Sequence, residues 1–523
     1  MRALRLLALT LVPLASTRPL AAADETPAKS KIVAVDLFKN GLAVVKRETT
    51  LGKAGVYVLD DVPAPIHGTF YIDSTGTVDV AVQMRDVEVP ANETAPGALQ
   101  DDLAGKKVTI HFKGANRPPV SGTMMKFKPA KGEEGALAGR FYVVQTAKGR
   151  AYVDPADVSA VESDDAGNTV TRRKPRLTFT LKDTDKAQTV VSVRYITTGL
   201  SWAPTYRIDI TDPKKLTLEQ HAAVKNELAD LADAEVRLIS GYPSVEYAHV
   251  RSPLAPRTSL ASFFGELGGG RHREIDALSN GIVSQNTVSL NNYRVHNVAL
   301  GAVPTGEGVD LHYQSIGKRT MAEGDAFSTV VAKGTADYER IVEWLIPDGR
   351  DVYGRHNGGD DGEAWDALKF KNPLNFPMTT GPATVTAGGK FNGQRTSYWV
   401  NAGEETVLRV EKALSVRTRA SENEKLERDG SGREVIWIGG RQFRRTTVEG
   451  EIAVSNHRKE NVSLVVRRRF SGELVTAEGA PRTALREEGV YSVNKRQELL
   501  WTVALKGGEE KKIKYSYTVL TMN

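Results

Sequence analysis

The sequence predicts a mainly β, multi-domain protein. Apolar and polar residues alternate along many short segments, which is the period of a strand with one buried face. Turn-forming pairs such as Asn40-Gly41 separate these segments, as in tight hairpins. The chain has 523 residues, of which 40% are hydrophobic, so it is long enough for about three domains of ~150 residues.

The first 23 residues predict a secretory signal peptide. Arg2 and Arg5 precede an apolar run over residues 6–14, and three alanines end at Ala23. A basic start, a short apolar run and small residues at a cleavage site define such a signal. We expect cleavage after Ala23 and export to the periplasm or the exterior. We expect no transmembrane helix in the mature chain, because no other apolar run is long enough to span a bilayer.

Two small β units are predicted next. Residues 31–90 form an N-terminal β domain, in which Val78, Val80 and Val82 alternate with polar or small residues. A polar stretch with Pro and Gly follows and indicates a linker. Residues 100–165 then hold about five short apolar segments, a density typical of a small barrel of the SH3 or Sm type.

Residues 175–523 are predicted as one or more antiparallel β-sandwich domains. Near the end of the chain, Ile513 and Tyr515 share one face of a strand, and Lys512 and Lys514 share the other. Such one-sided strands, joined by glycine-rich turns, are typical of sandwiches.

An irregular insert at 250–310 interrupts this region, because it is rich in Ser, Asn, Gly and Pro. Inside it, apolar residues at helical spacing predict a short helix that begins after Ser259 and ends at Gly268. This helix packs on its own domain, lies in a loosely ordered insert, or docks on a partner or a membrane surface. Its polar face is not basic, which disfavours the membrane. The apolar residues are Leu260, Phe263, Phe264 and Leu267.

Composition excludes several classes of protein. The chain has no cysteine, so it has no disulfide, no cysteine-linked lipid anchor and no Cys-type zinc site. The formal charge of +6 falls to +3 once Arg2, Arg5 and Arg18 leave with the signal, which disfavours nucleic acid as a partner. We interpret the basic runs at 172–174 and 467–469 as a solvated linker and a strand rim, with a polyanion site as the alternative.

Residues 199–206, Gly-Leu-Ser-Trp-Ala-Pro-Thr-Tyr, resemble the Gly-x-Ser-Trp-x-Pro-x-Tyr signature of the bacterial envelope family called domain of unknown function 4139. Members of that family are often labelled mucoidy-inhibitor-like. Further motifs match in collinear order, and the unit at 31–90 is similar to the family's N-terminal partner domain. The signature residues of the match are Ser201, Trp202, Pro204, Tyr206, Asn226, Thr380, Gly381, Pro382, Gln394, Asn456, Asn494 and Trp501.

The resemblance implies a fold and an envelope location, but no catalytic residues, because the family has no established activity. The chain departs from the family at 227–231, which reads Glu-Leu-Ala-Asp-Leu instead of Thr-Gly-Glu-Asp-Trp. It also has the barrel-like unit where the family often has a coiled coil. We interpret the motifs as structural: Trp202 and Pro204 suit a strand end, and Gly381-Pro382 suits a turn.

No catalytic or cofactor-binding motif is present. The nine histidines lack the HExxH spacing, and Gly-x-Ser-x-Gly is absent. The densest polar segment is most simply an acidic, glycine-rich surface loop; its oxygen ligands make it a weak candidate for Ca²⁺. The residues of that candidate are Asp351, Asp360, Asp361, Glu363 and Asp366.

Our leading hypothesis is therefore a non-enzymatic scaffold or binding module of the cell envelope, with envelope proteins or glycans as partners and no cofactor. One alternative is a hydrolase of envelope glycans, which would need paired carboxylates about 5–10 Å apart. Another is a carbohydrate-binding protein that uses Trp365, Trp399 or Trp437, although core packing is the more usual role of a tryptophan.

Overall fold

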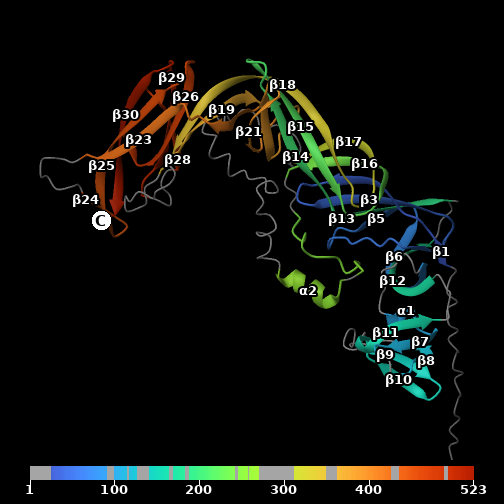
Figure 1. Ribbon diagram of the computed structural model, residues 1–523. Helices are drawn as coiled ribbons and strands as arrows, with labels where there is room; N and C mark the ends of the chain where they lie inside the picture. The colour runs from blue at the N-terminus through green and yellow to red at the C-terminus, as the bar shows by residue number, and fades with distance from the viewer. Residues whose placement is uncertain are drawn as a thin grey trace, which may run out of the picture. The chain divides into compact units, whose positions relative to one another are not determined.

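The computed structural model confirms the mainly β prediction (Figure 1). The strands of the described residues form five sheets. The chain divides into two compact units, one drawn from Met1–Lys31, Arg47–Arg194 and Val250–Leu267, the other from Ile32–Lys46, Tyr195–His249 and Gly268–Asn523. The structure describes residues 25–90, 99–114, 117–125, 141–163, 169–182, 188–241, 245–256, 258–269, 311–348, 362–425, 435–487 and 493–522.

A four-stranded sheet in the first unit has the order β1-β4-β12-β6. The edge strand β6 pairs with β12 in an antiparallel ladder from Thr77↔Lys182 to Pro90↔Thr169. Leu177, Phe179 and Leu181 are buried in this sheet, although sequence analysis places them at the start of the third domain. The basic run at 172–174 likewise lies within β12 and not in a linker. The strands are β1 (Glu25–Pro27), β4 (Gly55–Leu59), β6 (Thr77–Pro90) and β12 (Thr169–Lys182).

The predicted barrel is an open sheet in the part of the chain that the structure describes. Its strand order is β10-β9-β8-β7-β11, and no ladder joins β10 to β11. It has a core of its own around Ile110, Met124 and Val144. Its elements are α1 (Leu99–Asp102), β7 (Lys107–Phe112), β8 (Val120–Met124), β9 (Tyr142–Thr146), β10 (Gly149–Val153), a 3-10 turn (Pro155–Asp157) and β11 (Val158–Ser163).

Short elements complete the first unit and lead to the second. In the first unit, β5 pairs with β13 at Tyr71↔Arg194. In the second, β16 pairs in parallel with β2 and antiparallel with β17. The elements are β2 (Lys31–Leu37), β3 (Leu42–Leu51), β5 (Tyr71–Ser74), β13 (Thr189–Thr198), β16 (Leu231–Ser240), α2 (Leu260–Gly269) and β17 (His312–Met321).

Two further sheets of the second unit enclose two hydrophobic cores. The first core gathers Tyr206, Leu218 and Phe370 between β14/β15 and β19/β22. The second gathers Trp501 and Tyr517 between β18/β26/β29 and β25/β30. The strands are β14 (Leu200–Asp209), β15 (Lys215–Asn226), β18 (Ala326–Ile346), β19 (Ala364–Lys371), β20 (Gly381–Ala387), β21 (Lys390–Ser397), β22 (Glu405–Lys412), β23 (Val416–Glu424), β24 (Val435–Ile438), β25 (Arg441–Asn456), β26 (Val462–Ser471), β27 (Glu473–Ala477), β28 (Arg482–Glu487), β29 (Arg496–Leu505) and β30 (Glu510–Met522).

Strand β18 belongs to both cores. Its 21 residues pair first with β15, up to Asp337, and then with β19 and β26, from Tyr338 onward. One continuous strand thus fixes the position of one core relative to the other, and the surface between them is where the site described below lies.

Close packing of β25 on β30 gives a test of the second core. Gly450 stands opposite Tyr515, and a Cβ at Gly450 would overlap the tyrosine ring. We predict that Gly450→Ala lowers stability by about 1–3 kcal/mol because the core must shift. Gly265→Ala is the matched control: its Cβ would meet no atom within 4 Å, and alanine favours the helix. Thermal unfolding followed by near-UV circular dichroism measures both; an unchanged melting temperature for Gly450→Ala would refute this packing.

Candidate functional site

The signature residues Trp202, Pro204 and Tyr206 are all buried on one face of β14, in the second unit. Trp202 is 2% exposed, and its Nε1 donates to Ile239 O at 3.2 Å. The hydroxyl of Tyr206 donates to Thr379 O at 2.8 Å. Pro204 lies in the middle of β14, so the expected strand end is wrong. It is tolerated there because β14 pairs with β20 only from Tyr206 onward, which leaves the edge beside Pro204 unpaired with β20.

The Thr-Thr-Gly-Pro motif meets a buried lysine. Lys39 is 8% exposed, and its ammonium donates to Thr379 Oγ1 at 3.0 Å and to Thr380 O at 2.8 Å. Gly381 is required beside this contact, because a Cβ there would lie 2.7 Å from Pro204 O. The sequence pattern marks only a turn at Asn40-Gly41 and gives no sign of Lys39, because the partners of Lys39 lie about 340 residues away.

Burial lowers the pKa of Lys39 to about 8. The ammonium has two oxygen partners, and no carboxylate in the described residues pairs with it. Because Lys39 is nearly inaccessible, its role is structural: it ties the turn at 38–41 to Thr379 and Thr380, which directly precede β20. Gly381 and Pro382 are the first residues of β20 and oppose Ser397 and Thr396 in the β20–β21 ladder, so the expected turn at Gly381-Pro382 is wrong.

A buried asparagine holds the end of β15. Asn226 Nδ2 donates to Ala322 O at 3.0 Å, and its Oδ1 accepts from Leu228 N at 3.1 Å. Its backbone N–H donates to Asp325 O, and its carbonyl accepts from Gly324 N. We call this arrangement of an asparagine and a glycine turn an asparagine clamp.

The asparagine clamp recurs twice. Asn372 Nδ2 donates to Asn401 O at 3.1 Å, and Asn456 Nδ2 donates to Lys506 O at 3.1 Å. Each turn has a glycine with positive φ followed by an acidic residue whose side chain accepts from a backbone N–H of the turn. Asn372 is not among the signature residues that the sequence indicates, and the pair of Gly403 and Glu404 is the signal in the sequence that points to it. The pairs are Gly324 and Asp325 for Asn226, Gly403 and Glu404 for Asn372, and Gly508 and Glu509 for Asn456.

The remaining signature residues also form structural contacts. Asn494 exchanges two hydrogen bonds with the backbone of Leu520, and Trp501 Nε1 donates to Glu478 O at 2.8 Å. Ser201 Oγ lies 3.5 Å from the carbonyl oxygen of Lys39. Gln394 makes a single exposed bond to Thr384.

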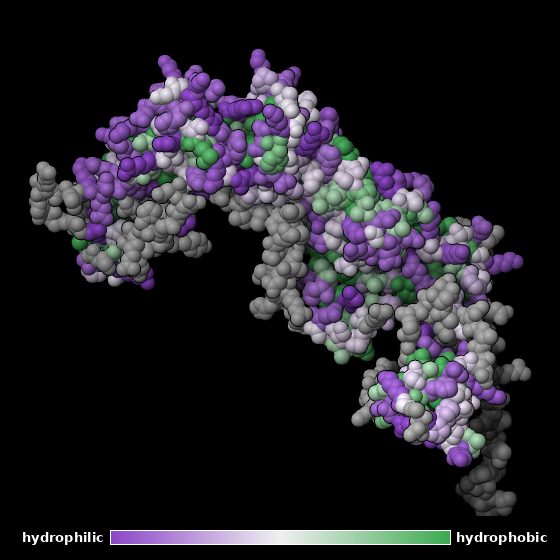
Figure 2. Space-filling model, in the orientation of Figure 1, coloured by the Kyte–Doolittle hydropathy of each residue, from purple (hydrophilic) through white to green (hydrophobic). Residues whose placement is uncertain are grey.

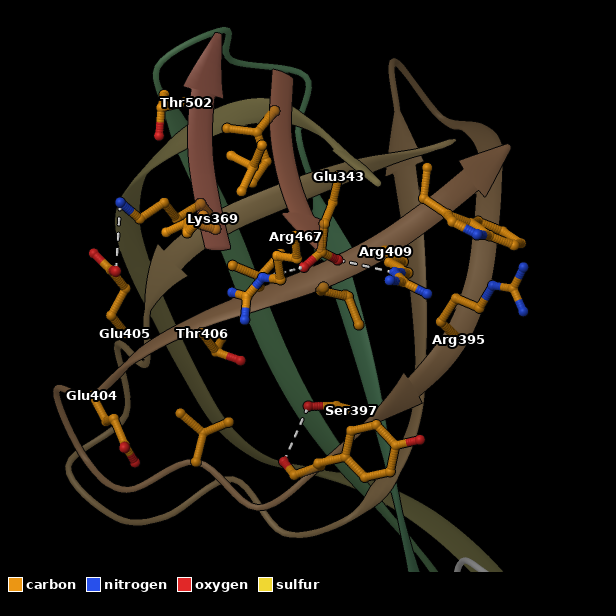
Figure 3. Close-up of a pocket in the computed structure, with 18 of the residues that line it drawn as sticks. Glu343, Lys369, Arg395, Ser397, Glu404, Glu405, Thr406, Arg409, Arg467 and Thr502 are labelled. Atoms are coloured by element: carbon orange, nitrogen blue, oxygen red, sulfur yellow. Dashed lines mark hydrogen bonds and ion pairs between the residues drawn. The ribbon is translucent and has the colours of Figure 1, made fainter. Parts of the chain in front are cut away.

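A cavity of about 850 Å³ opens on the ten-stranded sheet, which contains β14, β15, β18–β22, β26, β28 and β29 (Figure 3). Residues of β18, β19, β21, β22, β26, β28 and β29 line it. Its lining includes four aromatic residues, Trp365, Tyr398, Trp399 and Trp501, of which Trp501 is a buried core residue. Trp399 is fixed by a bond from its Nε1 to Asn401 Oδ1 at 2.9 Å. Two of the three tryptophans considered for carbohydrate binding thus come together, whereas Trp437 lies elsewhere, on β24.

The floor of this cavity is a buried charge network. Glu343 is 1% exposed; its Oε2 accepts from Arg409 Nε at 2.9 Å, and its Oε1 lies 3.2 Å from Arg467 Nε (Figure 3). Arg467 also reaches Glu498. The next residue, Arg468, points to the opposite face and is 3% exposed beside Glu422. The interpretation of 467–469 as a solvated strand rim is therefore wrong, because strand alternation sends these arginines into two buried networks.

The cavity is also lined by cations that are not part of this buried network of ion pairs. The Arg395 guanidinium lies 4.0 Å from the centroid of the Trp365 ring, as in a cation–π contact. Arg395 and Arg482 are exposed and form no ion pair within the described residues. Planar guanidinium groups beside aromatic faces suit a ligand that combines a carboxylate or sulfate with an apolar ring face.

The calcium candidate is only partly described. Asp351, Asp360 and Asp361 lie outside the described residues. Glu363 forms an ion pair with Lys412, and Asp366 forms a two-bond pair with Arg458. Among the described residues, no group of three or more potential metal ligands is found.

The predicted helix is present as α2. Ser259 Oγ accepts from Ser262 N at 3.0 Å and caps its start. Phe263 is buried, with its ring 4.9 Å from that of His67. Leu260, Phe264 and Leu267 are exposed, so the apolar face is only partly covered by described residues. No helix in the described part of the chain is long and apolar enough to cross a membrane.

Lys39 makes stability depend on pH. An unfolded lysine keeps its proton up to about pH 10, whereas the folded protein releases it near pH 8. Because the unfolded state then binds more protons, stability should rise by up to about 2 kcal/mol from pH 8 to 9.5. Urea unfolding across this range measures the gain. The Lys39→Met variant should lack it; an equal gain in that variant would contradict the assignment to Lys39.

The asparagine clamp predicts unequal effects for two signature residues. Asn456→Ala leaves buried carbonyl and N–H groups unpaired and should cost about 3 kcal/mol of unfolding free energy. Gln394→Ala loses one exposed bond and should cost less than about 0.5 kcal/mol. Similar losses for both variants in urea unfolding would show that the clamp does not carry this stability.

A comparison with family models matches residues 191–520 to the domain of unknown function DUF4139. This match covers the cavity, the three asparagine clamps and the signature residues, and it spans more than half of the chain. No curated protein matches the chain. The chain therefore belongs to the DUF4139 family, as the motifs in its sequence predict.

Proposed function

We propose that this protein is an exported, non-enzymatic binding module of the cell envelope, and that its cavity binds an acidic glycan. The proposal rests on one observation: aromatic side chains and exposed guanidinium groups line the same cavity. The aromatic residues are Trp365, Tyr398 and Trp399, and the guanidinium groups are those of Arg395 and Arg482. The signal-like first 23 residues support export.

The chemistry of the lining favours a sugar with a negative charge. Aromatic side chains offer flat apolar faces, and the guanidinium groups offer paired donors for a carboxylate or sulfate. Ser397, Thr406 and Thr502 add polar groups around the cavity (Figure 3). Its volume of about 850 Å³ is within the range of ordinary ligand pockets.

The carboxylates of the cavity favour binding over hydrolysis. Glu343 accepts from Arg409 and faces Arg467, and Lys369 pairs with Glu405. Glu404 is held in an asparagine clamp by its bond from Asn401 N. A glycosidase needs two carboxyl groups that are free to face the scissile bond, whereas these three carboxylates are engaged by partners within the protein.

The proposal is tested by calorimetric titration with oligogalacturonate, an acidic glycan, and with its fully methyl-esterified form as the uncharged control. We predict binding of the acidic form that weakens as salt rises. Trp365→Ala and Arg395→Ala should each weaken binding about tenfold, as expected for the loss of about 1.4 kcal/mol.

Lys390→Ala is the matched control, because Lys390 is an exposed cation of the same strand that does not line the cavity. It should bind like the wild type. Equal binding by Trp365→Ala and the wild type would refute the cavity as the site. Release of new reducing ends from the oligosaccharide would refute the non-enzymatic assignment.

A further inference from the structure

The hairpin of β24 and β25 presents apolar side chains to solvent. Its turn is Gly439-Gly440, with φ of 55° and 76°, so only two residues separate the strands. Trp437 is 68% exposed, Val435 43% and Ile438 40%. Figure 1 shows β24 near the C-terminal end of the chain. Large apolar groups exposed together on a tight turn indicate a contact surface.

Basic residues lie directly behind this tip. The segment 435–448 contains three arginines and no acidic residue. Arg441 follows the turn, is exposed, and has no ion pair within the described residues. Arg444 is 3.6 Å from Glu424, and Arg445 is exposed on the same strand. The hairpin therefore ends in an apolar tip with cationic groups behind it.

We propose that this hairpin inserts its tip into the surface of an anionic lipid bilayer. Tryptophan prefers the membrane–water interface, and arginines near the surface are attracted to anionic headgroups. The ladder from Val435↔Arg444 to Ile438↔Arg441 satisfies the backbone between the two strands, so the tip can enter without unpaired inner N–H groups.

The two faces of the hairpin favour a fluid surface over a protein groove. Strand alternation places Val435 and Trp437 on one face and Ile438 on the other. A rigid partner would cover one face, whereas lipid surrounds both. The exposed residues of α2 lack this charge pattern, because the last turn of that helix has no basic residue. The proposal is independent of the glycan cavity.

The test is flotation of the full chain with vesicles of phosphatidylglycerol and phosphatidylcholine in equal amounts, and with phosphatidylcholine alone. We expect flotation with the anionic vesicles only. Trp437→Ser should weaken partition about tenfold, and Arg441→Gln about fivefold. Brominated phosphatidylcholine in the anionic vesicles should quench the fluorescence of the wild type, whereas Trp437→Phe should float but lose this quenching.

Phe391→Ser is the matched control, since Phe391 is also a large apolar residue that is 69% exposed beside a Gly-Gly turn. The one cation directly adjacent to it in the sequence is Lys390. It should float like the wild type. The proposal is overturned if the wild type does not float, or if Trp437→Ser floats equally well. It is also overturned if Trp437→Ser instead abolishes self-association in sedimentation without vesicles, which would make a second copy the occupant.

Discussion

The asparagine clamp is the constraint on which the second unit depends. A strand that ends inside a protein leaves carbonyls and N–H groups that must find partners. At Asn226, Asn372 and Asn456, one fully engaged amide serves this need, and a positive-φ glycine with an acidic residue closes the facing turn. The clamp ties a strand end to a turn far away in the sequence, so it fixes which strands meet and in what register.

The asparagine clamp at Asn372 also positions residues of the candidate site. Glu404, which closes its turn, lines the cavity, and Asn401 of the same turn holds the indole of Trp399 by a bond of 2.9 Å. The strand that follows carries Arg409, which binds Glu343 on β18. One turn thus holds Trp399 and leads into the strand that supplies Arg409 to the floor of the cavity.

Sequence alone predicts the strands well and their partners poorly. The alternation around Ile513 and Tyr515 marks β30 because burial of one face is a local pattern. The pairing of β14 with β20 joins residues such as Tyr206 and Ala383, and nothing local encodes it. The same holds at the site. Trp365 and Trp399 stand out singly, but their meeting with Arg395 depends on sheet order. The prediction of a barrel was wrong for the same reason. Five strands can be recognised in the sequence, but the sequence does not show whether the two edge strands, β10 and β11, pair to close the sheet.

The buried charges beneath the cavity are better explained by their effect on strand register than by a gain in the free energy of folding. A buried ion pair gains little over well-packed apolar residues, because both ions lose their hydration. Yet Glu343 and Glu498, each 1% exposed, hold arginines from β22, β26 and β28. Slipping any of these strands by one residue would turn a buried arginine to the other face and leave a carboxylate without its partner. A chain without cysteine has no disulfide to prevent such slips. The buried ion pairs therefore make wrong strand registers costly at the floor of the cavity. The asparagine clamps have the same effect at the strand ends.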